Sequence, residues 1–335
     1  MTNTVVNQKQ IAATLGISQI HVSRALSGKG YVSDAIRDRV LRTAEKMGYQ
    51  PNLLARGLAR KKSMNVGLLF PLDNRFLGYG ILGSAVLFMQ SHNLLKAGYN
   101  PVILSKQFLF ENTDAYLANL QVDGIIAFSM TGYFLNIFKK TGKPVVSMYP
   151  QYQFKKTGND NRLIHILVDK KSGITELAEY TKKQKKKLCI IGFHGTQEKF
   201  SDTHNSYFKI ISSLHPDFSV RDVFLIPRNV HGIQHNLNKI IKHLKNYSLI
   251  FISNHILPVY LQQMITAGSF RPVKNTEFVY DAVLPFTDTV NVEMKRITYS
   301  LEEMTRIGNN CVISAIEKKG IEKNYIIPSY LYHKK

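Results

Sequence analysis

The spacing of apolar residues separates a short N-terminal segment from the rest of the chain. In residues 1–48 apolar positions recur at helical intervals, in three stretches with polar start signals and glycine stop signals. The start signals are Asn7 (with Gln10 three residues on), Ser18 and Ser33, and the stop signals are Gly16 and Gly48. The apolar residues of the third stretch are Ile36, Val40, Leu41, Ala44 and Met47. Three helices are therefore predicted in this segment.

The second predicted helix sets one apolar residue apart from the others. On a helical wheel of about 100° per residue, Val22, Ala25 and Leu26 share the side that faces the other two helices. Ile20 lies about 160° from Val22 on that wheel, so it cannot join the same core. A single exposed apolar residue is common, and this is one explanation.

A helix, a glycine turn and a second helix, followed by a third, form the arrangement that lays a recognition helix in the major groove of DNA. In that groove an aliphatic side chain meets a thymine methyl group, while polar side chains bond base edges or phosphates. Ile20 is therefore predicted to be exposed because it contacts DNA. The predicted DNA-contacting residues of this segment are Ser18, Gln19, Ile20, His21, Ser23, Arg24 and Ser27.

From residue 65 the pattern changes to short apolar runs rich in β-branched residues, most of them separated by amphipathic helical stretches. The runs are 65–71, 100–105, 123–129, 143–149, 188–193 and 248–253, and the helical stretches include 79–96, 112–120 and 171–186. Strands that alternate with helices predict parallel sheets built from βαβ units. About 270 residues are too many for one such open sheet, so we expect two lobes.

The chain of 335 residues carries a formal net charge of +21, which favours polyanionic partners such as nucleic acid or an anionic membrane surface. Residues 1–63 contain 11 Lys and Arg against 3 Asp and Glu, so the head is enriched in positive charge, although the remainder is basic too. Solubility alone is the other explanation of such a charge. The basic run KKQKKK at 182–187 ends a predicted helix just before a strand and is interpreted as a solvated turn.

Several classes of protein are excluded. The only cysteines, Cys189 and Cys311, imply no disulfide framework, and neither a signal-peptide core nor a run of about 18 apolar residues occurs. We therefore expect a cytoplasmic protein that does not span a membrane. GYGILG at 78–83 spells a dinucleotide fingerprint but does not directly follow a strand. His231 and His235 lack further metal ligands nearby, and no nucleophile–base pair is recognisable, so we expect no cofactor, metal or enzyme activity.

The head resembles the DNA-binding head of the lactose-repressor (LacI/GalR) family of bacterial transcription regulators. The matching pieces are IAATLGIS at 11–18, VSRALSGKGYVS at 22–33, RDRVLRTAEKMGYQPN at 37–52 and ARGL at 55–58. The resemblance implies that Gln19 and Ile20 set operator preference, that His21 faces a phosphate, and that Ser23 and Arg24 contact bases and backbone.

The segment after the head is similar to the hinge of the catabolite-control branch of that family. The predicted hinge contacts are Asn52, Ala55 and Leu58, and the resemblance implies that Ala55 and Leu58 enter the minor groove, with Leu58 as a wedge between central base pairs. Ala59 departs from the pattern, because many relatives carry a Lys or Arg there. That substitution leaves one minor-groove base contact unaccounted for.

The remainder resembles the family's core, which is like a periplasmic binding protein. This implies an all-α helix-turn-helix head followed by an α/β core of two lobes, with two parallel sheets, three crossovers and an effector held in the cleft. The predicted divisions are the DNA-binding domain at 1–48, the hinge segment at 49–63 and the effector-binding and dimerisation core at 64–335. Lobe one is predicted at about 65–163 and 299–322, and lobe two at about 164–298 and 323–335.

The resemblance implies four effector-site residues: Phe76, His204, Asn254 and Asp281. His204 stands where the family has a sugar-binding arginine, and His255 and Ala282 replace two family aspartates. Arg and Asp hold sugars through paired bonds to adjacent hydroxyls, so these losses weaken the case for an ordinary sugar. A different ligand, a protein corepressor or no effector at all remain open, and Asn254 and Asp281 are alternatively strand-end caps.

The sequence therefore predicts a homodimeric, sequence-specific regulator of transcription, a repressor that binds a pseudo-palindromic operator in double-stranded DNA. The alternative is a solute-binding protein or an enzyme whose function resides in the α/β core, with the head as a basic anchor.

Overall fold

The structure is a computed structural model, which describes most of the chain in short segments. The described residues are 6–28, 30–49, 62–70, 77–104, 116, 119–128, 137–148, 162–194, 202–227, 232–254, 256–281, 294–320, 322 and 324–332. The chain divides into two compact units, Met1–Met64 and Asn65–Lys335.

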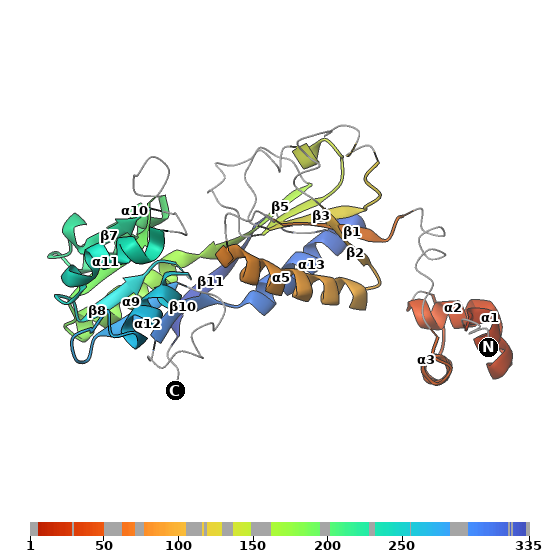
Figure 1. The fold of residues 1–335 in the computed structure, drawn as a ribbon. Helices are drawn as coiled ribbons and strands as arrows, with labels where there is room; N and C mark the ends of the chain where they lie inside the picture. Colours follow the sequence, from red (N-terminus) through yellow and green to blue (C-terminus); the bar gives the residue numbers. More distant parts are fainter. Residues whose placement is uncertain are drawn as a thin grey trace. The chain divides into compact units, whose positions relative to one another are not determined.

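The first unit contains the three predicted helices, α1 (Gln8–Leu15), α2 (Gln19–Ser27) and α3 (Asp34–Lys46) (Figure 1). Asn7 and Gln10 form the predicted capping box, since the Asn7 Oδ1 accepts the Gln10 N–H at 3.0 Å and the Gln10 Oε1 accepts the Asn7 N–H at 2.8 Å. Gly16 has a φ of 64°, a conformation that an L side chain disfavours, and it ends α1. Ser33 precedes α3 but its side chain makes no capping hydrogen bond.

The core of this unit is formed by one face of each helix. Its buried residues are Ile11, Ala12, Val22, Ala25, Val32, Val40 and Ala44. The prediction that Leu41 belongs to the apolar face of α3 is wrong, because this side chain is 46% exposed. One residue after the fully buried Val40, the helix has turned by about 100°, which carries Leu41 out of the core.

The second unit alternates strands and helices. Its strands are β1 (Asn65–Leu69), β2 (Asn100–Leu104), β3 (Gly124–Phe128), β4 (Val145–Met148), β5 (Leu163–Asp169), β6 (Leu188–Phe193), β7 (Val223–Ile226), β8 (Leu249–Ile252), β9 (Glu277–Asp281), β10 (Met294–Tyr299) and β11 (Asn324–Tyr332). Its helices are α5 (Leu77–Lys96), α9 (Lys170–Lys183), α10 (Asp202–Leu214), α11 (Ile233–Leu244), α12 (Leu257–Thr266) and α13 (Leu301–Ile316), with a 3-10 turn, η2 (Val220–Asp222). Strands occupy all six predicted runs, whereas most of the predicted helical stretch 112–120 lies outside the described residues.

The described strands follow the order β2-β1-β3-β4-β5-β11-β10-β9-β8-β6-β7. Two separate sheets were expected, and the structure instead joins two parallel halves through β11. Residues 324–328 of this strand pair in parallel with β5, and residues 329–332 pair antiparallel with β10. Because β11 is nine residues long, it contributes to both halves and makes the strand order continuous.

Helices cover both faces of the half that contains β6 to β10. Strand residues alternate between the faces, so Leu249 and Phe251 pack with α9 and α10, while Ile250 and Ile252 pack with α11 and α12. In the other half α5 and α13 pack together against the sheet (Figure 1). A doubly covered parallel sheet requires near-continuous apolar strands, and this requirement explains why runs such as 188–193 are buried at every position.

Candidate nucleic-acid interface and effector site

The outward face of α2 carries every residue that the sequence predicts to contact DNA in the head. Ile20 is 63% exposed, whereas Val22, on the opposite side of the same helix, is fully buried. The other exposed residues of this set are Ser18, Gln19, His21, Ser23, Arg24 and Ser27. The structure thus brings an aliphatic side chain, hydroxyls, an amide, an imidazole and a guanidinium together on one solvent-facing surface.

The ends of α2 fix the position of this surface. Ser18 begins the helix, and its Oγ accepts the backbone N–H of His21 at 3.3 Å. Gly28 ends the helix with a φ of 66°. Gly30, with a φ of 81°, leaves room for the stem of Arg24, because a Cβ at that position would lie 3.2 Å from the Arg24 Cδ. The two glycines therefore turn the chain away and leave Arg24 exposed beside the turn.

Four of the predicted site residues lie outside the described residues. These are the hinge residues Asn52, Ala55 and Leu58 and the effector-site residue Phe76. His204 lies in α10, and its side chain is also outside the described part. Their roles stay predictions.

Asp281 ends β9 and is held by two polar side chains. The Lys170 Nζ donates to its Oδ2 at 2.6 Å, and the Tyr207 hydroxyl donates to the same oxygen at 2.8 Å. Lys170 is the first residue of α9 and Tyr207 lies in α10, so three elements meet at this carboxylate. The Asp281 side chain is only 11% exposed, which strengthens the ion pair relative to one in water.

Sequence reasoning missed Lys170 and Tyr207, although one signal was present. Lys170 directly follows β5, and Asp281 ends β9. In α/β folds, ligands bind beyond the carboxyl ends of the strands. Polar residues immediately after apolar runs were therefore candidates for a ligand site. The ion pair between Lys170 and Asp281 was not predictable, because the two residues are far apart in the sequence.

Asn254 follows β8, and its side chain is engaged by the local backbone. Its Oδ1 accepts the N–H of Ile256 at 2.7 Å, which closes an Asx turn at the end of the strand. The sequence left two roles open for Asn254, an effector contact or a strand-end cap, and this hydrogen bond is the contact expected of a cap.

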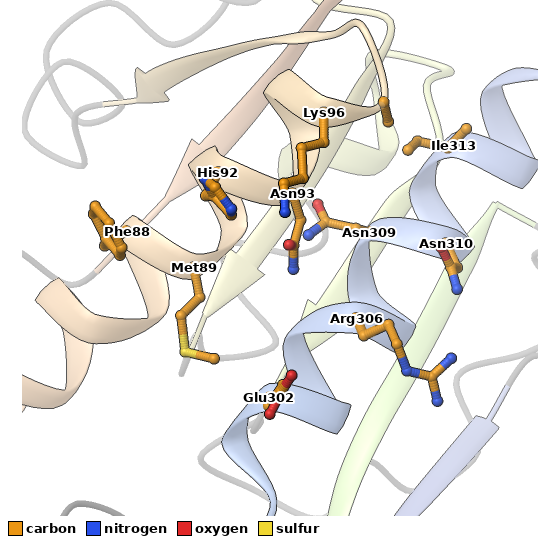
Figure 2. Close-up of a pocket in the computed structure, with 11 residues that line it drawn as sticks. Phe88, Met89, His92, Asn93, Lys96, Glu302, Arg306, Asn309, Asn310 and Ile313 are labelled. Atoms are coloured by element: carbon orange, nitrogen blue, oxygen red, sulfur yellow. The ribbon is translucent and has the colours of Figure 1, made fainter.

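A groove of about 420 Å³ lies between α5 and α13. Its lining residues are Phe88, Met89, His92, Asn93, Lys96, Ala97, Glu302, Arg306, Asn309, Asn310 and Ile313. Figure 2 shows the Asn309 amide directed toward Asn93. Asn309 is buried, and neither its Oδ1 nor its Nδ2 has a hydrogen-bond partner among the described residues. GYGILG falls in the first two turns of α5, so these glycines do not form a phosphate-binding loop after a strand.

The described part of the chain has neither a candidate metal site nor a membrane-spanning helix. It contains no group of three or more His, Cys, Asp or Glu side chains that would hold a metal ion. Within the same residues, no helix has both the length and the hydropathy of a membrane span.

The comparisons with known proteins agree with the form of the head. Residues 8–52 match the sequence profile described as "Bacterial regulatory proteins, lacI family". The HTH-type transcriptional regulator AscG of Escherichia coli K12 is 36% identical over 122 residues, 36% of this chain and 35% of AscG. Residues 8–52 are therefore a LacI-family DNA-binding domain. The resemblance inferred from the sequence is thereby confirmed.

Further LacI-family relatives extend the likeness beyond the head. The catabolite control protein A of Priestia megaterium is 36% identical over 146 residues, 41% of each chain. The aligned part thus spans well under half the length of these two curated relatives. A crystal structure of the Lac repressor dimer bound to operator and the anti-inducer ONPF has a TM-score of 0.62 at 14% identity, and the match covers 99% of this chain and 98% of that one. This confirms the predicted head and periplasmic-binding-protein-like core as the fold.

Proposed function

We propose that the chain is a sequence-specific DNA-binding repressor of transcription rather than an enzyme. The observation that carries this proposal is the outward face of α2, where Ile20 is exposed and Val22, on the opposite side, is buried. An exposed aliphatic residue among hydrogen-bonding side chains on a second helix suits a major groove, which presents thymine methyl groups beside donors and acceptors. The rival, an α/β protein with a basic anchor, does not require this side-chain set.

Roles within the proposed interface follow from chemistry. Gln19 and Ile20 read base edges, Arg24 bonds a guanine edge or a phosphate, and Ser18 and His21 contact the backbone. Beyond the helix, Asn52, Ala55 and Leu58 are proposed to contact DNA from the hinge segment. The positive charge of the head adds attraction that does not depend on sequence.

The active form is proposed to be a homodimer on a pseudo-palindromic operator. Apolar side chains stand exposed on α5 and on β2, which is the last strand of the described sheet at that side. Phe88 is 73% exposed, and Leu95 and Ile103 are also exposed. Burying these side chains against a second copy would remove an apolar surface from water and place two heads under one two-fold axis. The solved Lac repressor is described as a dimer bound to operator.

Regulation is proposed to occur through an effector or a protein corepressor that binds the core and shifts the population of DNA-binding states. Asp281, one of the predicted effector contacts, is already paired with Lys170 and bonded to Tyr207. A neutral sugar would have to compete with these contacts for the carboxylate. An ordinary free monosaccharide or disaccharide is therefore not the proposed effector.

A selection from randomised duplex DNA tests the proposal. The intact protein should enrich one pseudo-palindromic motif, because two equivalent heads read two equivalent half-sites. Arg24→Ala should weaken binding to that motif by about 1–3 kcal/mol if it bonds a base edge. Arg39→Ala, a change at an exposed residue of α3, serves as the control for lost charge. Failure of the intact protein to enrich any motif would favour the basic-anchor alternative.

A further inference from the structure

Three turns of the second unit meet at the edge where β6, β8 and β9 begin. The first residues of these parallel strands are in register, with Leu188 beside Leu249 and Leu249 beside Glu277. Neighbouring strands lie about 4.8 Å apart, so the preceding turns at 184–187, 245–248 and 267–276 lie side by side. Each turn also follows the carboxyl end of a helix: α9, α11 and α12.

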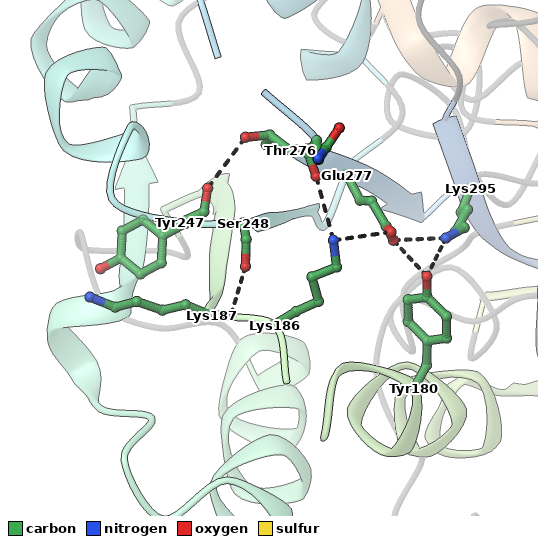
Figure 3. Close-up of polar contacts among 9 residues, drawn as sticks. Tyr180, Lys186, Lys187, Tyr247, Ser248, Thr276, Glu277 and Lys295 are labelled. Carbon is green, nitrogen blue, oxygen red and sulfur yellow. Dashed lines mark hydrogen bonds and ion pairs between the residues drawn. The ribbon is translucent and has the colours of Figure 1, made fainter. Parts of the chain in front are cut away.

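Hydrogen bonds connect the three turns into one surface. The Lys187 N–H donates to the Ser248 Oγ at 2.8 Å (Figure 3). The Leu249 N–H donates to the Lys187 carbonyl at 3.0 Å. The Glu277 N–H donates to the Ser248 carbonyl at 3.0 Å. Side chains on these turns are therefore presented from a fixed backbone.

Glu277 forms ion pairs with two partly buried lysines of this surface, Lys186 and Lys295. It accepts from the Lys295 Nζ at 2.7 Å and from the Tyr180 hydroxyl at 2.8 Å, and the Lys186 Nζ lies 3.3 Å from its other oxygen (Figure 3). Burial favours the neutral acid, but the hydrogen bonds from Lys295, Tyr180 and Lys186 outweigh it and lower the pKa of Glu277. Its negative charge is thus already matched by two ammonium groups.

The outer cations of this surface have no such acid. Eight exposed cationic side chains, none ion-paired with a carboxylate of the described residues, form what we call the basic edge: Lys182, Lys183, Lys185, Lys187, Lys242, Lys245, Arg271 and Lys274. Other acids nearby are the exposed Glu179 on α9 and, in the adjoining turn before β7, Asp217 and Asp222, with Arg221 beside them. Positive charge therefore predominates along the turns that precede β6, β8 and β9.

Lysines near helix ends have a simpler explanation, because a cation stabilises the carboxyl end of a helix dipole. That effect involves only the last turn of each helix. Lys185, Lys187 and Lys274 lie beyond the helices that precede them, and Arg271 lies five residues past the end of α12. Helix stabilisation does not account for these four charges.

We propose that the basic edge is a second DNA-binding surface that holds the phosphate backbone of a duplex without reading its sequence. Seven of its eight cations are lysines, flexible point charges that suit phosphates rather than paired bonds to base edges. Outside residues 1–63 the chain still contains 33 Lys and Arg against 20 Asp and Glu, a net charge of 33 − 20 = +13, which favours a polyanionic partner. The inference rests on the proposed function, since a head bound to an operator raises the local concentration of flanking or looped DNA.

The test compares two variants of the full chain that lose equal charge. The basic-edge variant combines Lys182→Gln in the last turn of α9 with Lys245→Gln and Lys274→Gln in the turns before β8 and β9. The control combines Lys140→Gln, Lys209→Gln and Lys318→Gln, three exposed lysines elsewhere in the second unit. Circular dichroism first establishes that both variants retain the fold.

Salt dependence of binding to a long random-sequence duplex is the main measurement. The slope of log K against log salt concentration should become shallower by about 2–3 in the basic-edge variant relative to the control, if each lysine neutralises one phosphate. On a short duplex that spans only the two half-sites, the variants should agree. Acetylation of the unmodified protein, mapped by mass spectrometry, should show Lys182, Lys245 and Lys274 protected by the long duplex.

Equal slopes for the two variants on long DNA, together with unprotected lysines, would overturn the proposal. Binding to phosphatidylserine vesicles that requires the basic edge, without a change in the DNA slopes, would assign the surface to a membrane and also overturn it. These results are distinguishable from a failure of the proposed function. Loss of motif enrichment would remove the operator-reading role but leave the comparison on random DNA intact.

Discussion

Ser18 and His21 contact each other at two points. The Ser18 Oγ accepts the backbone N–H of His21 at 3.3 Å and lies 2.8 Å from the His21 Nδ1. The hydroxyl can donate to Nδ1 or accept from an Nδ1–H, depending on the tautomer of the ring. The same serine that begins α2 thus orients the imidazole of a residue proposed to face a DNA phosphate.

Substitutions at Ser18 should separate helix stability from DNA binding. Ser18→Ala removes the cap and should reduce stability by about 1 kcal/mol, seen as faster amide hydrogen exchange in α2. Ser18→Asp retains a good cap, so exchange should stay slow, but its negative charge should weaken DNA binding. If both variants exchanged like the unmodified protein, Ser18 would not stabilise α2 through this hydrogen bond.

Glu277 should make stability depend on pH. Its folded-state pKa lies below the ordinary value of 4.5, so its contribution is complete above that value and is lost as pH falls through the folded pKa. Glu277→Gln should therefore lower the free energy of unfolding most at neutral pH and progressively less in acid, as measured by urea unfolding. Glu179→Gln, at an exposed position on α9, is the control for the loss of one carboxylate. A difference between Glu277→Gln and the unmodified protein that stayed constant from neutral to acid pH would contradict the role of Glu277.

Common neutral sugars should not bind the core tightly. The carboxylate of Asp281 is bonded to Lys170 and Tyr207, and the sequence resemblance predicts His204 in place of the family's arginine. A thermal-shift screen with free monosaccharides and disaccharides should give no shift, and calorimetry should give no micromolar affinity. Binding of one neutral sugar at micromolar affinity would contradict the proposal that the effector is not an ordinary sugar.

Leu58→Ser should weaken operator binding and abolish DNA bending. The residue is proposed to unstack a central base step, a cost of roughly a few kcal/mol that added contacts offset. The segment 52–58 is too short for a stable isolated helix, which requires about 12–15 residues, so its folding should depend on DNA. Binding to random DNA should change little, because phosphate contacts dominate that affinity. A circular-permutation gel assay checks both effects, and unchanged bending by the variant would show that Leu58 is not the wedge.

The features that depend on only a few neighbouring residues were the most predictable from the sequence. The capping box of Asn7 and Gln10, the start at Ser18 and the glycine stop at Gly16 depend on local hydrogen bonds and backbone freedom. The apolar runs around β1, β3 and β6 were equally clear, because strands buried on both faces have few polar positions. The exposed position of Ile20 followed from helix geometry alone.

Features that depend on distant partners were not predictable. Asp281 is bonded to residues 111 and 74 positions away, and no local pattern indicates either contact. Residues 324–332 were not predicted as a strand, since Pro328 interrupts them and their pairing with both β5 and β10 is a property of the assembled core. The apolar pattern of α3 predicted that both Val40 and Leu41 are buried. A helix turns by about 100° between successive residues, so only Val40 faces the core.

The central claim is that the outward face of α2 reads DNA, and one comparison tests it most directly. The unmodified protein and Ile20→Asn are passed separately through selection from randomised half-sites. Asparagine offers a donor and an acceptor where isoleucine offers only apolar contact, so the variant should return a motif altered at one position of each half-site, with adenine favoured there. Two identical motifs would contradict the assignment of α2 as the recognition helix.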